Sequence, residues 1–279
     1  MQNSVLIPNK LYKYHSNTDY ALPALINGNV WFSTKKYLND PFEFININYE
    51  ISDEKYTKTW NKRLSKLGYG KSDIDLEMID LLRQKDSRMK TGSELIEKSL
   101  KSMGLYCLTT KPDNILMWSH YADSHKGFCI EFDTHPKRYS PDQHFRKVSY
   151  LRRYPKLTPF DFEPCGYCDN CKQSRSVSLD KYINCEFIGK NFNTLVGTKS
   201  KDWEYEDEYR VAHEGLNNGQ VSEGFLWPMQ KLGLSVSAII LGSDMPEEET
   251  VKIRYQLEDR CPIRFAKNSK RDFRMIGCV

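Results

Sequence analysis

The sequence predicts an α+β fold in a single domain over residues 1–279, built on a central mixed β-sheet. Short segments with apolar residues at every second position, which is typical of half-buried strands, recur along the chain. Segments with helical spacing of apolar residues stand between them. No internal repeat or low-complexity linker divides the chain, so one mixed domain is the simplest interpretation.

Composition indicates a globular protein rich in aromatic residues. The 279 residues include 17 Tyr and 13 Phe, and 41 basic residues against 37 acidic ones give a net charge of +4. The basic residues are dispersed, so charge alone does not predict nucleic-acid binding. No run of 18 apolar residues occurs and the first residues do not resemble a signal peptide. We therefore expect a cytoplasmic protein without a membrane partner, whose cysteines are reduced.

Individual elements follow from local pattern. A turn is expected at Asn39-Asp40-Pro41, because Asn and Asp side chains can bond their own backbone and proline prevents a helix from continuing. Helices are expected over 19–29 and 114–124 and from Pro246 onward, where three glutamates suit the positive helix start. Strands are predicted at 10–16, 30–33, 104–109, 128–132, 147–150, 237–242, 263–266 and 273–276.

Two segments differ in composition from the predicted strands and helices. Residues 53–103 are rich in Lys, Glu, Leu and Ile at helical spacing, which predicts a helical insertion of two or three amphipathic helices. Residues 160–190 form a polar, turn-rich loop that holds four cysteines. Neither segment shows a catalytic motif.

The stretch from Lys201 to His213, KDWEYEDEYRVAH, predicts a strand with two unlike faces. Aromatic residues alternate with acidic ones, so Glu204, Glu206 and Glu208 would share a face at spacings of roughly 7 Å. Carboxylates so placed repel one another when they are partly buried. The stretch is either the solvated face of an edge strand or a site that needs carboxylates on a rigid backbone.

The cysteine loop predicts a metal site. Cys165, Cys168 and Cys171 have the spacing C-x2-C-x2-C, and Cys185 follows fourteen residues later. Four thiolates at this spacing suit a structural, tetrahedral zinc ion with no open position. An iron–sulfur cluster and unliganded thiols are the alternatives.

An ordered set of motifs resembles a bacterial family known as domain of unknown function number 2971. The motifs are LYKYHS, WFSTKKYLNDPFE, LMWSHYADSHKGFCIEFD, KDWEYEDEYR and IILG, and they span residues 11 to about 245. His15 stands where the family commonly has arginine. The resemblance implies a gene context of phage defence or abortive infection, and with it a partner protein from a defence operon.

The opening of the chain is also similar to that of ADP-ribosyltransferases, in which a strand, a helix and a second strand form a cleft for NAD in a split sheet. Glu206-Asp207-Glu208 has the form of their Glu-x-Glu motif. The similarity implies that Glu208 is the essential carboxylate and that Glu206 orients the ribose or a protein or nucleic-acid acceptor. It further implies a dinucleotide site formed by Lys13, Tyr14, His15, Ser33 and Tyr121.

The sequence therefore predicts an NAD-consuming enzyme, with two alternatives left open. One is a non-catalytic, zinc-stabilised sensor or protein-binding module, in which the glutamates pair with Arg210 or lysines and meet no deep pocket. The weaker one is a metal-dependent nuclease. Its divalent-metal ligands would come from a scattered set of acidic and histidine side chains: Asp40, Glu43, His120, Glu131, Glu206 and Glu208.

Overall fold

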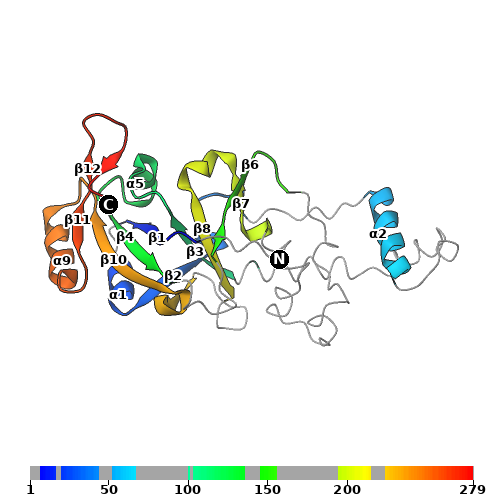
Figure 1. The fold of residues 1–279 in the computed structure, drawn as a ribbon, viewed down its shortest axis with the longest axis horizontal. Coiled ribbons are helices and arrows are strands. Elements are labelled where there is room, and N and C mark those ends of the chain that lie inside the picture. Colours follow the sequence, from blue (N-terminus) through cyan, green and yellow to red (C-terminus); the bar gives the residue numbers. More distant parts are fainter. Residues whose placement is uncertain are drawn as a thin grey trace. The chain divides into compact units, whose positions relative to one another are not determined.

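The computed structural model describes residues 7–16, 20–43, 52–66, 100, 103–135, 145–155, 194–214 and 224–278. The chain divides into two compact units. The first comprises Met1–Glu43, Lys101–Arg152 and Gly197–Val279, and the second comprises Phe44–Leu100 and Arg153–Val196. Helix α2 (Asp53–Lys66) belongs to the second unit (Figure 1). The predicted insertion at 53–103 and loop at 160–190 lie largely outside the described residues and stay predictions.

A nine-stranded mixed sheet forms the frame of the first unit (Figure 1). Strands β10 and β11 are parallel, and the other described pairs in this sheet are antiparallel. The strand order is β11 (Ile263–Phe265), β10 (Leu234–Leu241), β4 (Phe128–Thr134), β1 (Lys10–His15), β3 (Met103–Thr109), β2 (Asn29–Thr34) and β9 (Gly224–Pro228). Strand β8 (Glu208–Glu214) pairs with β3 and with β5 (Arg146–Lys147).

Smaller elements surround the sheet. The helices are α1 (Ala21–Ile26), α5 (Ile115–Tyr121) and α9 (Glu247–Leu257), and the 3-10 helices are η1 (Lys35–Tyr37), η5 (Lys201–Glu206) and η6 (Met229–Leu232). A parallel pair joins β6 (Ser149–Leu151) to β7 (Thr198–Ser200), and an antiparallel pair joins β12 (Lys267–Asn268) to β13 (Met275–Ile276). None of the helices in the described ranges combines the length and apolar character needed to cross a membrane.

The main sheet is split beside β3, because β1 and β2 each pair with only part of one edge of this strand. Strand β8 pairs with β3 over its whole length, so β1 and β2 must share the opposite edge. Strand β1 pairs there only through Tyr12 and Thr109, and β2 pairs only at Leu105 and Gly104. Residues 106–108 of β3 therefore have no described strand on this edge. The mixed sheet that the sequence predicts is confirmed, and it is split at this position.

The two faces of the sheet carry separate cores because side chains alternate along each strand. Phe128, Ile130 and Phe132 of β4 enter the larger core, as the sequence predicts, with Leu11 of β1. The opposite face is covered by α5, whose Trp118 is fully buried. Tyr12 and Tyr14 lie on this second face beside Trp118, and the rings of Tyr14 and Trp118 meet edge to face at 5.1 Å.

The predicted strand over Lys201–His213 is wrong in its first half. Residues 201–206 form the 3-10 helix η5, and the strand begins only at Glu208. Ser200 caps the helix by accepting from the N–H of Asp202, and Asp207 ends it in the left-handed conformation with φ 43°. The sequence does contain the local signals of a helix start, which are a serine cap and acidic residues in the first turn. The alternation of aromatic and acidic residues nevertheless favoured a strand in the prediction. Glu206 and Glu208 consequently lie on either side of a turn.

Two glycines allow the turn after α5 to lie directly against the end of β10. Asp123, Ser124 and His125 all have positive φ and reverse the chain into Gly127. The N–H of Gly242 then donates to the carbonyl of Gly127 at 2.9 Å. A Cβ atom on Gly242 would lie 2.0 Å from the backbone oxygen of His125, so no larger residue fits without moving backbone.

We predict that Gly242→Ala lowers the free energy of unfolding by about 3 kcal/mol, because the clash is with backbone that cannot rotate away. Gly28→Ala is the matched control, since Gly28 has φ 73° but nothing within 4 Å of its added Cβ. The backbone strain of an alanine at positive φ should lower the free energy of unfolding of that variant by about 1 kcal/mol. Urea denaturation of both variants measures the difference, and equal losses would contradict the close approach.

Candidate functional site

A cleft of about 310 Å³ lies at the opening of the sheet. Its walls come from β1, β2, β3, α5, β7, the segment around η1 and the turn between η5 and β8. Six of the seven residues that the sequence predicts for catalysis and dinucleotide binding line it: Lys13, Tyr14, Ser33, Tyr121, Glu206 and Glu208. The fold thus brings together residues that are up to 195 positions apart in the chain, as Lys13 and Glu208 are.

His15 does not line the cleft. Its ring stacks on Phe128 in the larger core, with centroids 5.5 Å apart. Burial, helped by the charge of Lys13, lowers the pKa of His15 to about 3. The ring of His15 thus lies against Phe128 and outside the cleft lining, and its contact with a dinucleotide stays a prediction.

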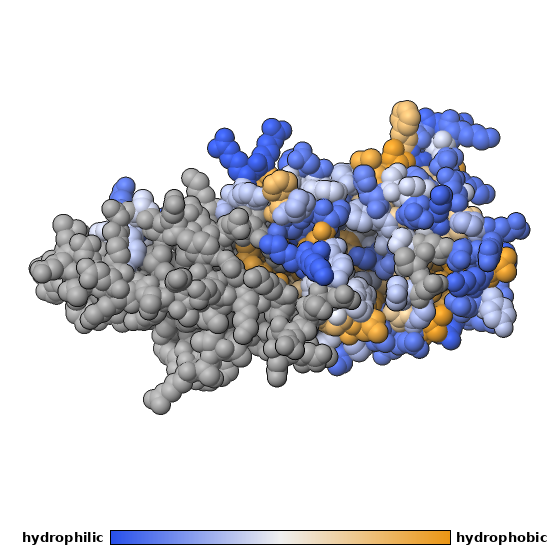
Figure 2. Space-filling model, turned by 180° about the vertical axis from the view of Figure 1, so that it is seen from behind, coloured by the Kyte–Doolittle hydropathy of each residue, from blue (hydrophilic) through white to orange (hydrophobic). Residues whose placement is uncertain are grey.

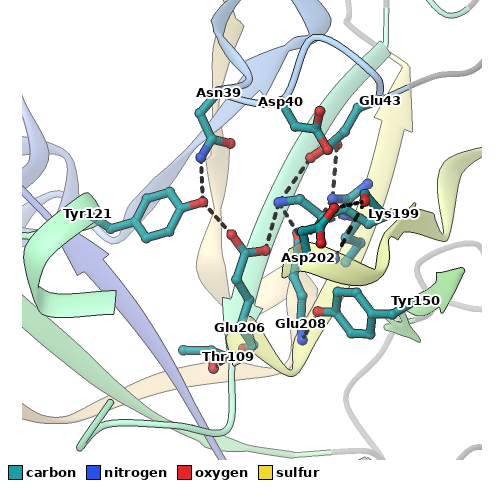
Figure 3. A network of polar contacts seen from close by, with 12 residues as sticks. Asn39, Asp40, Glu43, Thr109, Tyr121, Tyr150, Lys199, Asp202, Glu206 and Glu208 are labelled. Carbon is teal, nitrogen blue, oxygen red and sulfur yellow. Dashed lines mark hydrogen bonds and ion pairs between the residues drawn. The ribbon is translucent and has the colours of Figure 1, made fainter. Parts of the chain in front are cut away.

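Glu208 lines the cleft (Figure 3), and the guanidinium of Arg210 binds its carboxylate from behind the lining. They point to the same face of β8, and two bonds of 2.7 and 2.8 Å join the guanidinium to the two carboxylate oxygens. Burial acts to raise the pKa of Glu208, but the charges of Arg210 and Lys199 outweigh it, so the pKa falls well below the usual range. Glu208 is consequently a fixed anion whose oxygens already have a strong partner.

Lys199 of β7 stands at the centre of the network. Its side chain is 3% exposed, and its ammonium lies 3.0 Å from Glu43, 2.7 Å from Glu206 and 3.6 Å from Glu208. Burial acts to lower the pKa of Lys199, but the three surrounding carboxylates raise it above its ordinary value. Lys199 therefore remains protonated, and three carboxyl side chains surround its ammonium.

Glu206 connects this network to the open part of the cleft. One carboxylate oxygen accepts from Lys199 and the other from the hydroxyl of Tyr121, which in turn accepts from the amide of Asn39 at 2.6 Å (Figure 3). Burial raises the pKa of Glu206 to about 7, with repulsion from Glu208 adding to it and the charge of Lys199 opposing it. Glu206 can thus exchange a proton near neutral pH.

The loop before residue 44 supplies the remaining side chains that pair with Tyr121, Lys199 and Arg210. Asp40 accepts a hydrogen bond from the N–H of Phe42 at 2.9 Å, which confirms the turn predicted at Asn39-Asp40-Pro41. This turn places Asn39 beside Tyr121 and Glu43 beside Lys199 (Figure 3). Glu43 also pairs with Arg210 at 2.9 Å.

Among the described residues that are paired in this network, the charges do not balance when every carboxylate is ionised. Glu43, Glu206 and Glu208 carry three negative charges against the two positive charges of Lys199 and Arg210. A buried net charge is costly, and a proton is the smallest group that can neutralise it. The raised pKa of Glu206 indicates that the proton resides there.

Sequence reasoning missed the cation that organises this site. Lys199 lies at the edge of the irregular segment and no motif marks it. Of the ligands suggested for a nuclease, Glu43, His120, Glu206 and Glu208 line the cleft, whereas Glu131 is bound by Lys10, Ser237 and Arg264 on β1, β10 and β11. Within the described part of the chain, no group of three or more His, Cys, Asp or Glu side chains is arranged to hold a metal ion.

The four cysteines predicted to bind zinc lie outside the described residues. They are Cys165, Cys168, Cys171 and Cys185. The remaining four, Cys107, Cys129, Cys261 and Cys278, are free thiols.

Comparison with known proteins yields one family. Residues 117–211 match the model of a family described as protein of unknown function, DUF2971. The matched range begins in α5 and ends within β8, so it includes Tyr121, Lys199, Glu206 and Glu208. This match supports the family resemblance seen in the sequence motifs. No curated protein and no solved structure gives a significant match to the chain.

We predict that Lys199→Met destabilises the protein by roughly 3–5 kcal/mol at neutral pH, because it leaves buried carboxylates without their shared cation. The loss should shrink as the pH falls, since protonation of the carboxylates removes their repulsion. Urea denaturation as a function of pH measures both effects.

The double variant Lys199→Met/Glu206→Gln is the control for this prediction. Removing one carboxylate together with the cation should restore part of the lost stability. A double variant less stable than Lys199→Met would contradict the charge balance described above.

Proposed function

We propose that this cleft binds NAD and cleaves its nicotinamide–ribose bond, either by hydrolysis or by transfer of ADP-ribose to an acceptor. The observation that carries the proposal is Glu206, a carboxylate with a raised pKa that lines a cleft in a split sheet and is held by Tyr121 and Lys199. A volume of about 310 Å³ lies at the lower end of the range for small-molecule sites and suits the reacting half of a dinucleotide.

The reaction needs few groups from the protein. As the bond between nicotinamide and C1′ of the ribose breaks, its electron pair stays on the departing ring nitrogen, which becomes neutral. The ribose passes through an oxocarbenium-like state that a nearby carboxylate stabilises. Water or an acceptor then forms the new bond at C1′ and loses a proton. Glu206 is the group we assign to accept that proton, since a base is most effective when its pKa lies near the operating pH.

This assignment reverses the roles that the Glu-x-Glu resemblance implies. Glu208 is bound on both oxygens by Arg210, so we assign it to positioning Arg210 and Lys199 rather than to the chemistry. Glu206 has the higher pKa and the position toward Tyr121. The residue that changes protonation state is therefore the first glutamate of the motif.

Other lining residues fit a dinucleotide. The hydroxyl of Tyr14 donates to the backbone oxygen of Lys111 at 2.6 Å, which fixes the side chain where it borders the cleft. The ammonium of Lys13 lies 5.4 Å from the centre of the Tyr106 ring and makes no ion pair with another described residue. It is the cation that we assign to the pyrophosphate, and Ser33 borders the same cleft on β2.

The cleft supports this proposal over a non-catalytic module. A binding module would pair Glu206 and Glu208 with cations and would have no pocket beside them. The pairing is present, but so is a cleft lined by the same two glutamates. This favours the enzyme. The zinc site, the acceptor and a partner from a defence operon stay predictions.

We predict that the purified protein releases nicotinamide from NAD and that Glu206→Gln lowers the rate by roughly 100-fold or more. Chromatography of free nicotinamide measures the release. Leu226→Ala, at a side chain that is 48% exposed and outside the cleft, is the control and should retain the wild-type rate. Wild-type protein that is folded and neither binds nor cleaves NAD would refute the proposal.

The pH dependence gives an independent prediction. Because Glu206 acts as a base, the rate should rise with pH through about 7, where the carboxyl loses its proton. The hydrogen bond from Tyr121 favours the ionised form, so Tyr121→Phe should raise the pKa of Glu206 and move the midpoint to higher pH.

Tyr37→Phe serves as the matched variant for that measurement. Tyr37 also lines the cleft, but its hydroxyl makes no hydrogen bond to Glu206. Its pH profile should coincide with that of the wild type. A midpoint that moves equally in both variants, or in neither, would contradict the role given to Tyr121.

A further inference from the structure

The hairpin of β12 and β13 concentrates positive charge. Residues 267–274, KNSKRDFR, contain four basic residues and one acidic residue, which gives a net charge of +3 in eight residues. The whole chain of 279 residues has a net charge of only +4. The hairpin is therefore far more positive than the rest of the protein, although overall composition shows no such bias.

These charges are available to a partner. Lys267, Lys270 and Arg271 are exposed and make no ion pair with any described residue. Arg274 lies 3.5 Å from Asp272, but both side chains are more than half exposed, so water and salt screen the pair. The positive charge of the hairpin is thus mostly uncompensated within the described ranges.

An aromatic ring stands among these cations. Phe273 is 98% exposed, which is the highest value for a large hydrophobic side chain in the described part of the chain. Figure 2 shows hydrophobic surface next to hydrophilic surface on a projection at the upper right of the face in view. A phenylalanine kept in water forgoes the stabilisation that burial would provide, and this ring stands within a run of four basic residues.

The loop that carries the ring is held by hydrogen bonds between its own residues. The hydroxyl of Ser269 accepts from the N–H groups of Arg271 and Asp272, each at 3.2 Å, and the N–H of Ser269 donates to the carbonyl of Arg274 at 3.1 Å. Met275, immediately after the loop, is 2% exposed and belongs to the core around Trp118. The tip is consequently presented from a fixed base, which reduces the entropy lost on binding.

We propose that the β12–β13 hairpin binds single-stranded nucleic acid, with Phe273 stacking on a base and Lys267, Lys270 and Arg271 contacting phosphates. Proteins that bind single strands without sequence preference combine cations along the backbone with aromatic rings on which bases stack. One ring among cations matches this combination. A membrane surface fits less well, because interfacial binding relies on a broad apolar face rather than on a single ring.

The hairpin and the cleft both contact α5 or the residues just before it. The N–H of Met275 donates to the backbone oxygen of Asp113 at 3.0 Å, just before α5 begins, and α5 carries Tyr121 into the cleft. The hairpin is therefore attached to the segment that leads into α5, and α5 is one wall of the cleft. The binding itself does not depend on the proposed activity, and it can be measured without NAD.

The test is fluorescence anisotropy of the full-length chain with a labelled poly(U) oligonucleotide of about 15 nucleotides. We expect Phe273→Ala to weaken binding roughly tenfold, as the loss of one stacked base does. Lys270→Gln/Arg271→Gln should reduce the slope of log affinity against log salt by about 0.7 for each cation that contacts a phosphate.

Tyr255→Ala is the matched control, because Tyr255 is an aromatic side chain on α9 with 86% exposure. It should bind the oligonucleotide as the wild type does. The proposal is overturned by absence of binding, by binding that the hairpin variants leave unchanged, or by equal losses in Tyr255→Ala. Vesicles of anionic phospholipid that bind the hairpin as tightly as the oligonucleotide does would also overturn it.

Discussion

The site depends on one buried cation. Lys199 holds Glu43, Glu206 and Glu208 within 3.6 Å of its ammonium, and these carboxylates come from two distant parts of the chain, the loop before residue 44 and the turn between η5 and β8. Arg210 supplies the second positive charge and binds Glu208 on both oxygens. Buried ions are stable only when paired, so the loop before residue 44, the β6–β7 pair and β8 are constrained to meet at this point.

The imbalance of this network explains how an otherwise rigid site can do proton chemistry. Glu208 is fixed as an anion by Arg210, and Lys199 remains protonated among its neighbours. The network has one negative charge in excess when all three glutamates are ionised. Glu206 binds the proton that removes this excess, because burial and the repulsion from Glu208 favour its protonated form. The proposed function uses this difference between two glutamates that are only two residues apart.

Much of the frame could be predicted from the sequence, because short apolar segments between turn residues mark its strands. Strands β1, β3 and β4 lie where they are predicted, although β3 and β4 are buried on both faces. The alternation over Lys201–His213 identified the two glutamates but assigned them to one continuous strand, since pattern alone does not show the cap at Ser200 or the left-handed Asp207. Lys199 and the partnership of Glu43 were not predictable, because they depend on which distant segments meet.

The most direct measurement is the titration of the Glu206 carboxyl by carbon-13 NMR, with its signal assigned by its absence in Glu206→Gln, before and after addition of NAD. The account predicts a pKa of about 7 in the free protein. It also predicts a lower value with NAD bound, because the positively charged nicotinamide ring would favour the ionised carboxylate. A carboxyl that titrates in the ordinary range of glutamate and does not respond to NAD would contradict it.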